Sequence, residues 1–134
     1  MTVIDLGAGK GLSSIFLSKY NFKKLIAIEL DPELFCELSK ISHEYRFEAR
    51  HISALDFACE TDVEVDLIYA FNPFKIETLS IFIDILLERF NRPLYLIYFK
   101  PQELDIFYSK YLVLKSEYHR GHSANYFILC VTQR

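Results

Sequence analysis

The segment from Val3 to Gly11 constrains the fold of this chain more than any other stretch. It reads V-I-D-L-G-A-G-K-G, in which apolar residues suited to a buried parallel strand precede three glycines at alternate positions. The following residues, 12–17, have helical spacing. A strand, a tight turn and a helix in this order predict a ligand-binding corner, since glycine allows close backbone approach and a helix start presents free N–H groups to an anion.

The glycine spacing excludes two common phosphate-binding motifs. The dinucleotide fingerprint G-x-G-x-x-G requires glycine at position 12, where the chain has Leu12. A P-loop aligned on Lys10 requires glycine at position 4 and a hydroxyl at position 11, where the chain has Ile4 and Gly11. The pattern that remains is D-x-G-x-G-x-G, which begins at Asp5. It resembles the first motif of the class I S-adenosylmethionine-dependent methyltransferases.

Length and charge narrow the class of protein further. The 134 residues fit one domain, residues 1–134, which is long enough to bury most of a core. The formal net charge of −3 gives no overall reason to expect tight nucleic-acid binding, which usually shows as a basic face. No apolar run approaches the roughly 18 residues of a membrane span, and the N-terminus lacks a signal-peptide layout. We therefore expect a cytoplasmic protein without a membrane partner. Cys36, Cys59 and Cys130 form no C-x-x-C pair and are expected to be buried free thiols.

A second apolar segment, residues 24–30, carries an acid near its end. Glu29 lies 18 residues beyond Gly11, close to the spacing at which nucleotide-binding α/β folds place an acid after the second strand. A carboxylate there accepts hydrogen bonds from both ribose hydroxyls, each worth about 1.5 to 3 kcal/mol. The alternative is a solvated charge at a strand end. Asp31 and Pro32 then begin a helix, as N-cap and first helical residue.

Residues 45–51 are predicted to form a third strand, and residues 52–57 follow it at the place where the resemblance implies adenine recognition. Aligned on Ala54, the aspartate typical of the family is Ser53 in this chain. The exocyclic amine of adenine is then held by the Ser53 hydroxyl, by a backbone carbonyl or by Asp56. Asp56 has a second interpretation, as an acid that caps the loop.

The fourth predicted strand, residues 63–71, delivers Asn72, Pro73 and Phe74 at its carboxyl end, the edge where open α/β sheets bind ligands. The tripeptide resembles the [DNS]-P-P-[FYW] element of methyltransferases that modify amino groups, with one proline missing. As catalytic residues, an Asn carbonyl would accept a hydrogen bond from the incoming amine and Phe74 would cover the acceptor. The alternative is a strand-end turn closed by Asn-Pro.

The remaining chain predicts a helix over 76–90, a strand over 94–99, a short helix over 102–107 and two strands over 111–117 and 124–132. His119 and His122 lie in the turn between those last strands, and two histidines without an acid or Cys nearby favour a solvated turn over a metal site. The resemblance implies a Rossmann-like, doubly wound α/β fold, mostly parallel, with seven strands in the order 3-2-1-4-5-7-6 and a C-terminal antiparallel hairpin.

The resemblance also implies S-adenosyl-L-methionine as cofactor and S-adenosyl-L-homocysteine as product. On that alignment the glycine turn underlies the methionine moiety, Glu29 holds the ribose, Leu30 packs on adenine, and Asp5 orients the glycine loop or reaches the cofactor's amino group. The implied cofactor-binding residues are Asp5, Gly7, Ala8, Gly9, Gly11, Glu29, Leu30, Ser53, Ala54 and Asp56. The reaction is a direct displacement that depends on alignment, so no metal or dedicated nucleophile is required.

The leading functional hypothesis is methyl transfer to a nitrogen of a protein or small-molecule acceptor. Transfer to oxygen or carbon is a second hypothesis, and a cofactor-binding or scaffold subunit without catalysis is a third. Family members normally carry helices before the first strand, whereas the first predicted strand here begins at Thr2. We therefore expect a trimmed family member, or one covered by a partner or a second copy of the chain, with exposed apolar surface marking that interface.

Overall fold

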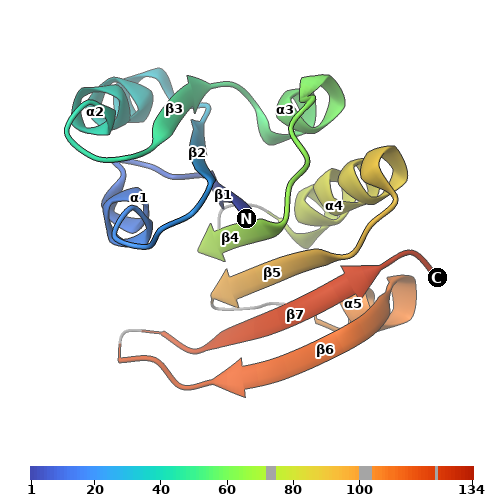
Figure 1. Ribbon diagram of the computed structural model, residues 1–134. Helices are drawn as coiled ribbons and strands as arrows, with labels where there is room; N and C mark the ends of the chain where they lie inside the picture. Colours follow the sequence, from blue (N-terminus) through green and yellow to red (C-terminus); the bar gives the residue numbers. More distant parts are fainter. Residues whose placement is uncertain (72–74, 100–103, 123) are drawn as a thin grey trace.

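A computed structural model describes residues 1–71, 75–99, 104–122 and 124–134. One seven-stranded sheet runs through the molecule, with helices on both sides (Figure 1). Its strands are β1 (Thr2–Leu6), β2 (Lys24–Glu29), β3 (Glu48–His51), β4 (Leu67–Phe71), β5 (Leu94–Phe99), β6 (Leu112–His119) and β7 (Tyr126–Thr132). Its helices are α1 (Leu12–Leu17), α2 (Pro32–Ser42), α3 (Ala54–Glu60), α4 (Ile76–Phe90) and α5 (Asp105–Lys110).

The strand order β3-β2-β1-β4-β5-β7-β6 confirms the predicted topology. Strands β1 to β5 are parallel, whereas β7 pairs antiparallel with both β5 and β6. The carboxyl ends of β1, β2 and β4 therefore lie next to one another at a single edge of the sheet. This edge is the expected ligand site of an open α/β sheet.

The two faces of the sheet are covered to different extents. On one face, α3, α4 and α5 bury a continuous apolar core that includes Ile4, Ile68 and Phe82. On the other face, α1 and α2 cover β1 to β3 through Leu17 and Leu38. Burial of these side chains supplies the main driving force for folding. None of the described helices is long and apolar enough to cross a membrane.

The second face carries a row of rings across its last four strands. Phe71, Phe99, Tyr126 and His119 occupy matching register positions on β4, β5, β7 and β6. Ring centroids lie 5.3 Å apart for Phe71 and Phe99, 4.8 Å for Phe99 and Tyr126, and 5.0 Å for Tyr126 and His119. Of the described helices, none lies over this part of the sheet (Figure 1). The row begins at the ligand edge and ends at the C-terminal hairpin.

Several boundaries differ from those predicted. Helix α1 ends at Leu17 instead of Tyr20, β3 begins at Glu48 instead of Tyr45, and β4 begins at Leu67 instead of Val63. The third strand starts late because residues 43–47 leave α2 in turns, with the Glu44 and Tyr45 N–H groups donating to the Ile41 carbonyl. The C-terminal strands are likewise 112–119 and 126–132, and α5 continues to residue 110.

Helix α3 was not expected between the third and fourth strands. Ser53 is its N-cap, with its hydroxyl oxygen accepting from the Asp56 N–H at 3.1 Å. This bond satisfies one of the free donors at a helix start. At the other end, the Arg89 guanidinium donates to the Ala58 carbonyl at 2.9 Å and to the Cys59 carbonyl, which caps the last turn. The signal in the sequence was the serine three residues before an acid, which is typical of a helix start.

All three cysteines are free thiols, as predicted, but the prediction that all are buried is wrong. Cys36 and Cys59 are exposed, and only Cys130 is buried. The first two lie on α2 and α3, where the adjacent positions Phe35 and Ala58 face the protein interior. Helical periodicity therefore turns the two thiols toward solvent.

Candidate functional site

The glycine loop joins β1 to α1 through backbone angles that favour glycine. Gly7, Gly9 and Gly11 have φ values of 70°, 60° and 96°. A Cβ on Gly11 would lie 2.8 Å from Leu38 Cδ1 and would also collide with Ile41 Cδ1, so this glycine lets α2 pack against the loop. A Cβ on Gly9 would meet nothing within 4 Å. The loop is therefore closed on its α2 side and open above Gly9.

Asp5 fixes the start of α1 from beneath the loop. Its side chain is 2% exposed, and Oδ2 accepts hydrogen bonds from the hydroxyls of Ser13 at 2.7 Å and Ser14 at 2.5 Å. Burial raises the pKa of Asp5, with a smaller contribution from Glu29, although the two serine bonds act in the opposite direction. The geometry agrees with an acid that orients the loop. The two serines were not singled out from the sequence, and their place in the first turn after the acid was the available signal.

The raised pKa of Asp5 predicts a pH effect on stability. A carboxyl whose pKa is higher in the folded state stabilises the fold fully below its unfolded value, 3.8, and this contribution is lost as pH rises through the folded value. Asp5→Asn removes the ionisation while keeping an oxygen that accepts from the serines. We expect the unfolding free energy of the wild type, relative to Asp5→Asn, to fall between about pH 4 and pH 7. Urea unfolding at both pH values measures this difference, and a constant difference would contradict it.

Glu29 ties the end of β2 to the glycine loop. Its Oε2 accepts a hydrogen bond from the Gly9 N–H at 2.7 Å, and Oε1 accepts from the N–H groups of Leu30 and Asp31, both at 3.0 Å. The carboxylate therefore lies at the ligand edge, directed to the loop instead of outward into solvent. The predicted role of Glu29, to hold the ribose, stays a prediction.

The carboxylate of Glu29 has acceptor capacity left for a ligand. Two carboxylate oxygens offer about four lone-pair positions, and three backbone donors use three of them. Oε1 carries two bonds and Oε2 carries one, so the remaining position is on Oε2, next to Gly9. The predicted ribose contact would place one hydroxyl at this position, and a second hydroxyl would require that a backbone donor give way.

Two hollows meet at Gly7. The first has a volume of about 260 Å³ and lies between the end of β2, the start of α3 and α4. It is lined by Gly7, Ile28, Glu29, Leu30, Ile52, Ser53, Ala54, Leu55 and Thr78. Five of the predicted cofactor-binding residues thus share one mainly apolar cavity, namely Gly7, Glu29, Leu30, Ser53 and Ala54. Leu30 is 61% exposed and offers its side chain to a ligand.

Sequence reasoning missed part of this first hollow. Ile52 and Leu55 flank the predicted Ser53 and Ala54, and Thr78 comes from the first turn of α4. Thr78 is distant in sequence, so only the packing of α4 against α3 brings it here. Asp56 lies in the first turn of α3 and is not among the lining residues. Its role in reading adenine stays a prediction.

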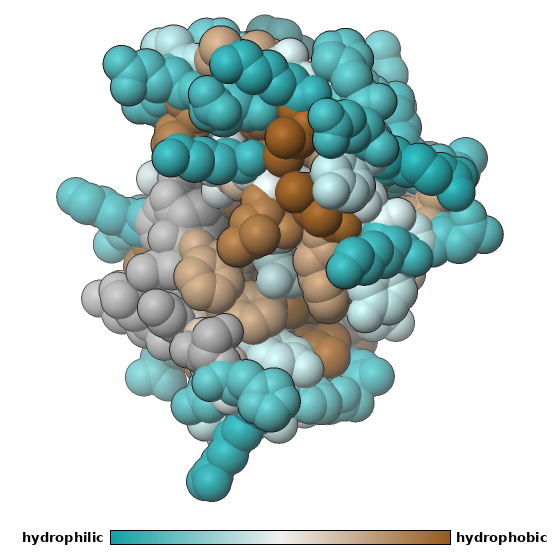
Figure 2. Space-filling view, turned by 90° about the vertical axis from the view of Figure 1, so that its left-hand side faces the viewer, coloured by the Kyte–Doolittle hydropathy of each residue, from teal (hydrophilic) through white to brown (hydrophobic). Residues whose placement is uncertain are grey.

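The second hollow, of about 410 Å³, lies over the start of α1 and the end of β4. It is lined by Gly7, Ala8, Lys10, Leu12, Ser13, Phe16, Tyr69 and Phe71. Apolar side chains gather at the centre of this edge of the molecule, with hydrophilic ones around them (Figure 2). Burial raises the pKa of Tyr69 to about 12, with Asp5 and Tyr126 contributing, so the phenol is neutral at physiological pH. The aromatic lining was not predicted, because the exposure of Phe16 and Phe71 depends on how α1 sits beside β4.

The predicted catalytic residues Asn72, Pro73 and Phe74 lie outside the described residues. Strand β4 ends at Phe71 beside the second hollow, so these three residues follow directly from its rim. Their roles stay predictions.

Solved structures similar to this chain include three methyltransferases. Magnesium protoporphyrin IX methyltransferase (ChlM) from Synechocystis PCC 6803, with bound SAM, has a TM-score of 0.66 at 16% identity, and 99% of this chain matches 70% of that one. N-methyltransferase NodS from Bradyrhizobium japonicum WM9 has a TM-score of 0.69 at 11% identity, over 98% and 85%. An rRNA methylase from Streptococcus thermophilus has a TM-score of 0.65 at 12% identity, over 98% and 86%. No protein-family model matches the sequence, and neither does any curated protein.

This chain has the class I methyltransferase fold. The neighbours cover nearly its whole length, so the fold assignment does not rest on the glycine motif alone. In this chain the glycine loop, Glu29 at the end of β2 and the end of β4 lie at the carboxyl edge of the sheet. The two hollows of this chain lie at that same edge.

Proposed function

We propose that this chain is an S-adenosylmethionine-dependent methyltransferase that acts on a nitrogen of a protein or small-molecule acceptor. The observation that carries the proposal is the Glu29 carboxylate, bonded to the Gly9 N–H at 2.7 Å where two hollows meet at Gly7. The carboxylate thus lies between two parts of the site. The mainly apolar cavity suits the adenine base of the cofactor, and the glycine loop suits its polar methionine end. ChlM, a neighbour in fold, was solved with bound SAM.

The residues fit an adenosyl amino acid in extended form. The apolar first hollow would take the adenine against Leu30, and the free lone pair on Glu29 Oε2 would accept from the ribose. The glycine loop, open above Gly9, would take the methionine end. The second hollow then remains for the acceptor, on the far side of Gly7.

When bound, S-adenosylmethionine supplies a methyl group on a sulfonium, which becomes the thioether of S-adenosylhomocysteine. The chain's part is alignment, because a well-oriented pair lowers the barrier by about 7 to 11 kcal/mol without a metal or covalent nucleophile. Tyr69 and Phe71 line the hollow proposed for the acceptor and restrict the acceptor's approach to the glycine loop. Their rings favour a flat acceptor, which gains stacking contacts of about 0.5 to 1.5 kcal/mol beyond its buried area.

Nitrogen is preferred as the acceptor atom because Asn72-Pro73-Phe74 follows the rim of the second hollow in the chain. An rRNA methylase among the neighbours makes a nucleobase nitrogen a further acceptor to test, although the net charge of −3 gives no general attraction to nucleic acid.

Transfer of radiolabelled methyl groups tests the proposal. The protein is incubated with labelled S-adenosylmethionine and, in separate reactions, amine, phenol, protein and RNA acceptors. Label on a nitrogen of the amine or protein acceptor supports the proposal. Label on a base nitrogen of the RNA would make nucleic acid the acceptor, and label only on oxygen or carbon would replace the proposal with the second hypothesis. Tight binding of the cofactor without transfer to any acceptor would favour a non-catalytic subunit.

Ser53 offers a test of how adenine is read. Ser53→Asp keeps an N-cap that accepts from the Asp56 N–H and restores the acid typical of the family. A charged acceptor makes a stronger hydrogen bond to the exocyclic amine than a hydroxyl does, so we expect S-adenosylhomocysteine to bind about threefold to tenfold more tightly. Calorimetry measures the change. Unchanged or weaker binding by a folded variant would exclude position 53 as the adenine reader.

A further inference from the structure

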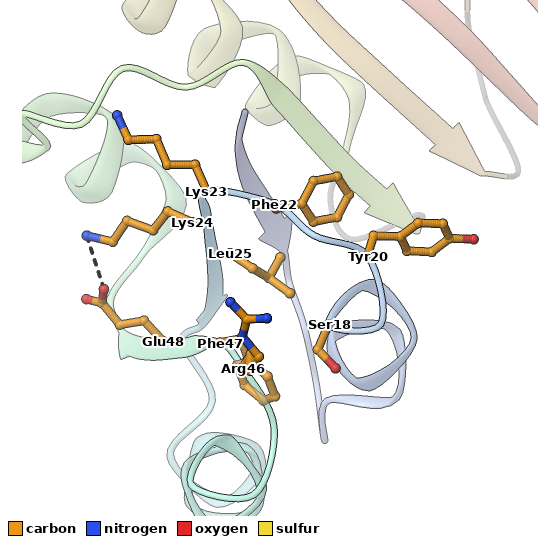
Figure 3. Close-up of a pocket in the computed structure, with 9 residues that line it drawn as sticks. All are labelled: Ser18, Tyr20, Phe22, Lys23, Lys24, Leu25, Arg46, Phe47 and Glu48. Carbon is orange, nitrogen blue, oxygen red and sulfur yellow. Dashed lines mark ion pairs between the residues drawn. The ribbon is translucent and has the colours of Figure 1, made fainter.

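A third hollow opens at the opposite edge of the sheet (Figure 3). It has a volume of about 290 Å³, near the lower end for small-molecule sites. Lys24 and Glu48, the first residues of β2 and β3, stand at its margin. Because Glu29 closes β2 at the other end, about 16 Å of strand separates this hollow from the proposed cofactor site. It is lined by Ser18, Tyr20, Phe22, Lys23, Lys24, Leu25, Arg46, Phe47 and Glu48.

The lining carries a surplus of positive charge. Lys23, Lys24 and Arg46 face one acid, Glu48, in a chain whose formal net charge is −3. Glu48 is already paired, at 3.3 Å from the Lys24 ammonium and 2.5 Å from the Arg50 guanidinium, and these cations lower its pKa. Within the described part of the chain, neither Lys23 nor Arg46 has an acid at ion-pair distance. Arg46 is therefore left without a neutralising partner, whereas Lys23 also lines a neighbouring hollow that holds Asp62, Glu64 and Asp66.

The cations stand beside fixed apolar walls. Phe22 and Phe47 are half-buried and pack against the core cluster that contains Leu25. Tyr20 is 55% exposed and its ring centroid lies 5.9 Å from that of Phe22. Figure 3 shows the Arg46 side chain extending toward Leu25, with Phe22 and Tyr20 on the other side of the hollow. The Lys23 side chain points away from Arg46, so a ligand held here meets rings on one flank and the Arg46 guanidinium on the other.

Helix ends do not account for these cations. Basic side chains stabilise the C-terminal end of a helix, but the effect is confined to its last turn. Helix α2 ends at Ser42, and Arg46 lies four residues beyond it. Helix α1 ends at Leu17, and Lys23 follows after the turn at residues 18–22. The Arg46 charge is therefore available to a ligand that enters the hollow.

We propose that this hollow binds a nucleoside phosphate, whose phosphate contacts Arg46 and whose base packs on Tyr20 and Phe22, with Lys23 adding positive charge at the margin. Arginine and lysine are the side chains that hold phosphate oxygens, and bases gain affinity by stacking on aromatic rings. The same chemistry is presented by a free nucleotide and by one nucleotide of a single strand. This site is independent of the proposed methyltransferase function.

Calorimetric titration with uridine 5′-monophosphate tests the site, since a pyrimidine avoids confusion with adenine binding at the cofactor edge. We expect a dissociation constant of about 1 mM or tighter, with uridine and inorganic phosphate each at least about tenfold weaker. Arg46→Gln should weaken binding about tenfold, and Lys23→Gln should weaken it less. Lys40→Gln is the matched control, because Lys40 is exposed on α2 and pairs with Glu37, and it should leave binding unchanged.

A second titration, with a single-stranded uridine hexanucleotide, distinguishes a free nucleotide from one nucleotide of a strand as the ligand. Affinity about tenfold higher than that of the mononucleotide, again reduced by Arg46→Gln, supports a nucleic-acid strand as the ligand. Equal affinity supports a free nucleotide. The proposal is overturned if no heat appears at about 5 mM nucleotide, if phosphate alone or uridine alone binds equally well, or if Glu29→Ala abolishes binding while Arg46→Gln does not.

Discussion

Gly11→Ala is expected to lower the free energy of unfolding by about 2 to 5 kcal/mol. The φ of 96° at this position is in the left-handed region, which costs an L-residue about 1 to 2 kcal/mol. The added Cβ would also lie 2.8 Å from Leu38 Cδ1 and collide with Ile41 Cδ1, and such overpacking costs about 1 to 3 kcal/mol. Both effects would destabilise the contact between the glycine loop and α2.

Gly9→Ala is the matched control for this prediction. Its φ of 60° is also left-handed, but its Cβ would meet nothing within 4 Å. We therefore expect a loss of only about 1 to 2 kcal/mol. Urea unfolding of both variants measures the difference. Equal losses of unfolding free energy would show that the contact with α2 adds nothing to the cost at Gly11.

A double variant separates the steric part of the Gly11 effect from the backbone part. Ile41→Val removes the Cδ1 atom that the new Cβ would meet. In the Gly11→Ala background this change should cost less than it does in the wild type, because it relieves the collision. The coupling free energy between the two positions reports that relief.

The sequence predicted most reliably those features that depend on the ends of strands. Asp5, the glycine turn and Glu29 follow apolar segments directly, so their arrival at one sheet edge follows from parallel pairing. The strand order came from the resemblance, since spacing along the chain does not determine which strands pair. The late start of β3 and the unexpected α3 show the weakness of short apolar segments, in which helix and strand patterns are hard to distinguish.

The details that build the site were beyond sequence reasoning. The Glu29 to Gly9 bond depends on a side-chain rotamer, although both residues were identified. Thr78 and Phe71 reach the hollows because α4 packs on α3 and because β4 ends beside α1. Tertiary packing of this kind leaves no local pattern to detect, and the same holds for Arg46 and Tyr20, which line one hollow at the opposite edge.

Glu29→Ala is expected to weaken binding of S-adenosylhomocysteine by about 1 to 3 kcal/mol, or about fivefold to 150-fold. The variant removes the carboxylate that would accept from the ribose and also the bond to the Gly9 N–H. The loop then loses one hydrogen bond to β2 but keeps another, which the Ala8 N–H donates to the Ile28 carbonyl at 2.9 Å. Glu29→Gln should give a smaller loss, because the amide keeps one acceptor oxygen but has no charge.

The most direct measurement is a calorimetric titration of the wild type, Glu29→Ala and Glu88→Ala with S-adenosylhomocysteine. Glu88 is an exposed acid on α4 away from both hollows at the carboxyl edge of the sheet, so its variant controls for loss of a negative charge. The wild type and Glu88→Ala should bind equally, and Glu29→Ala should bind at least about fivefold more weakly while remaining folded. No binding by the wild type, or equal affinity in all three proteins, would contradict a cofactor site built on Glu29 and the glycine loop.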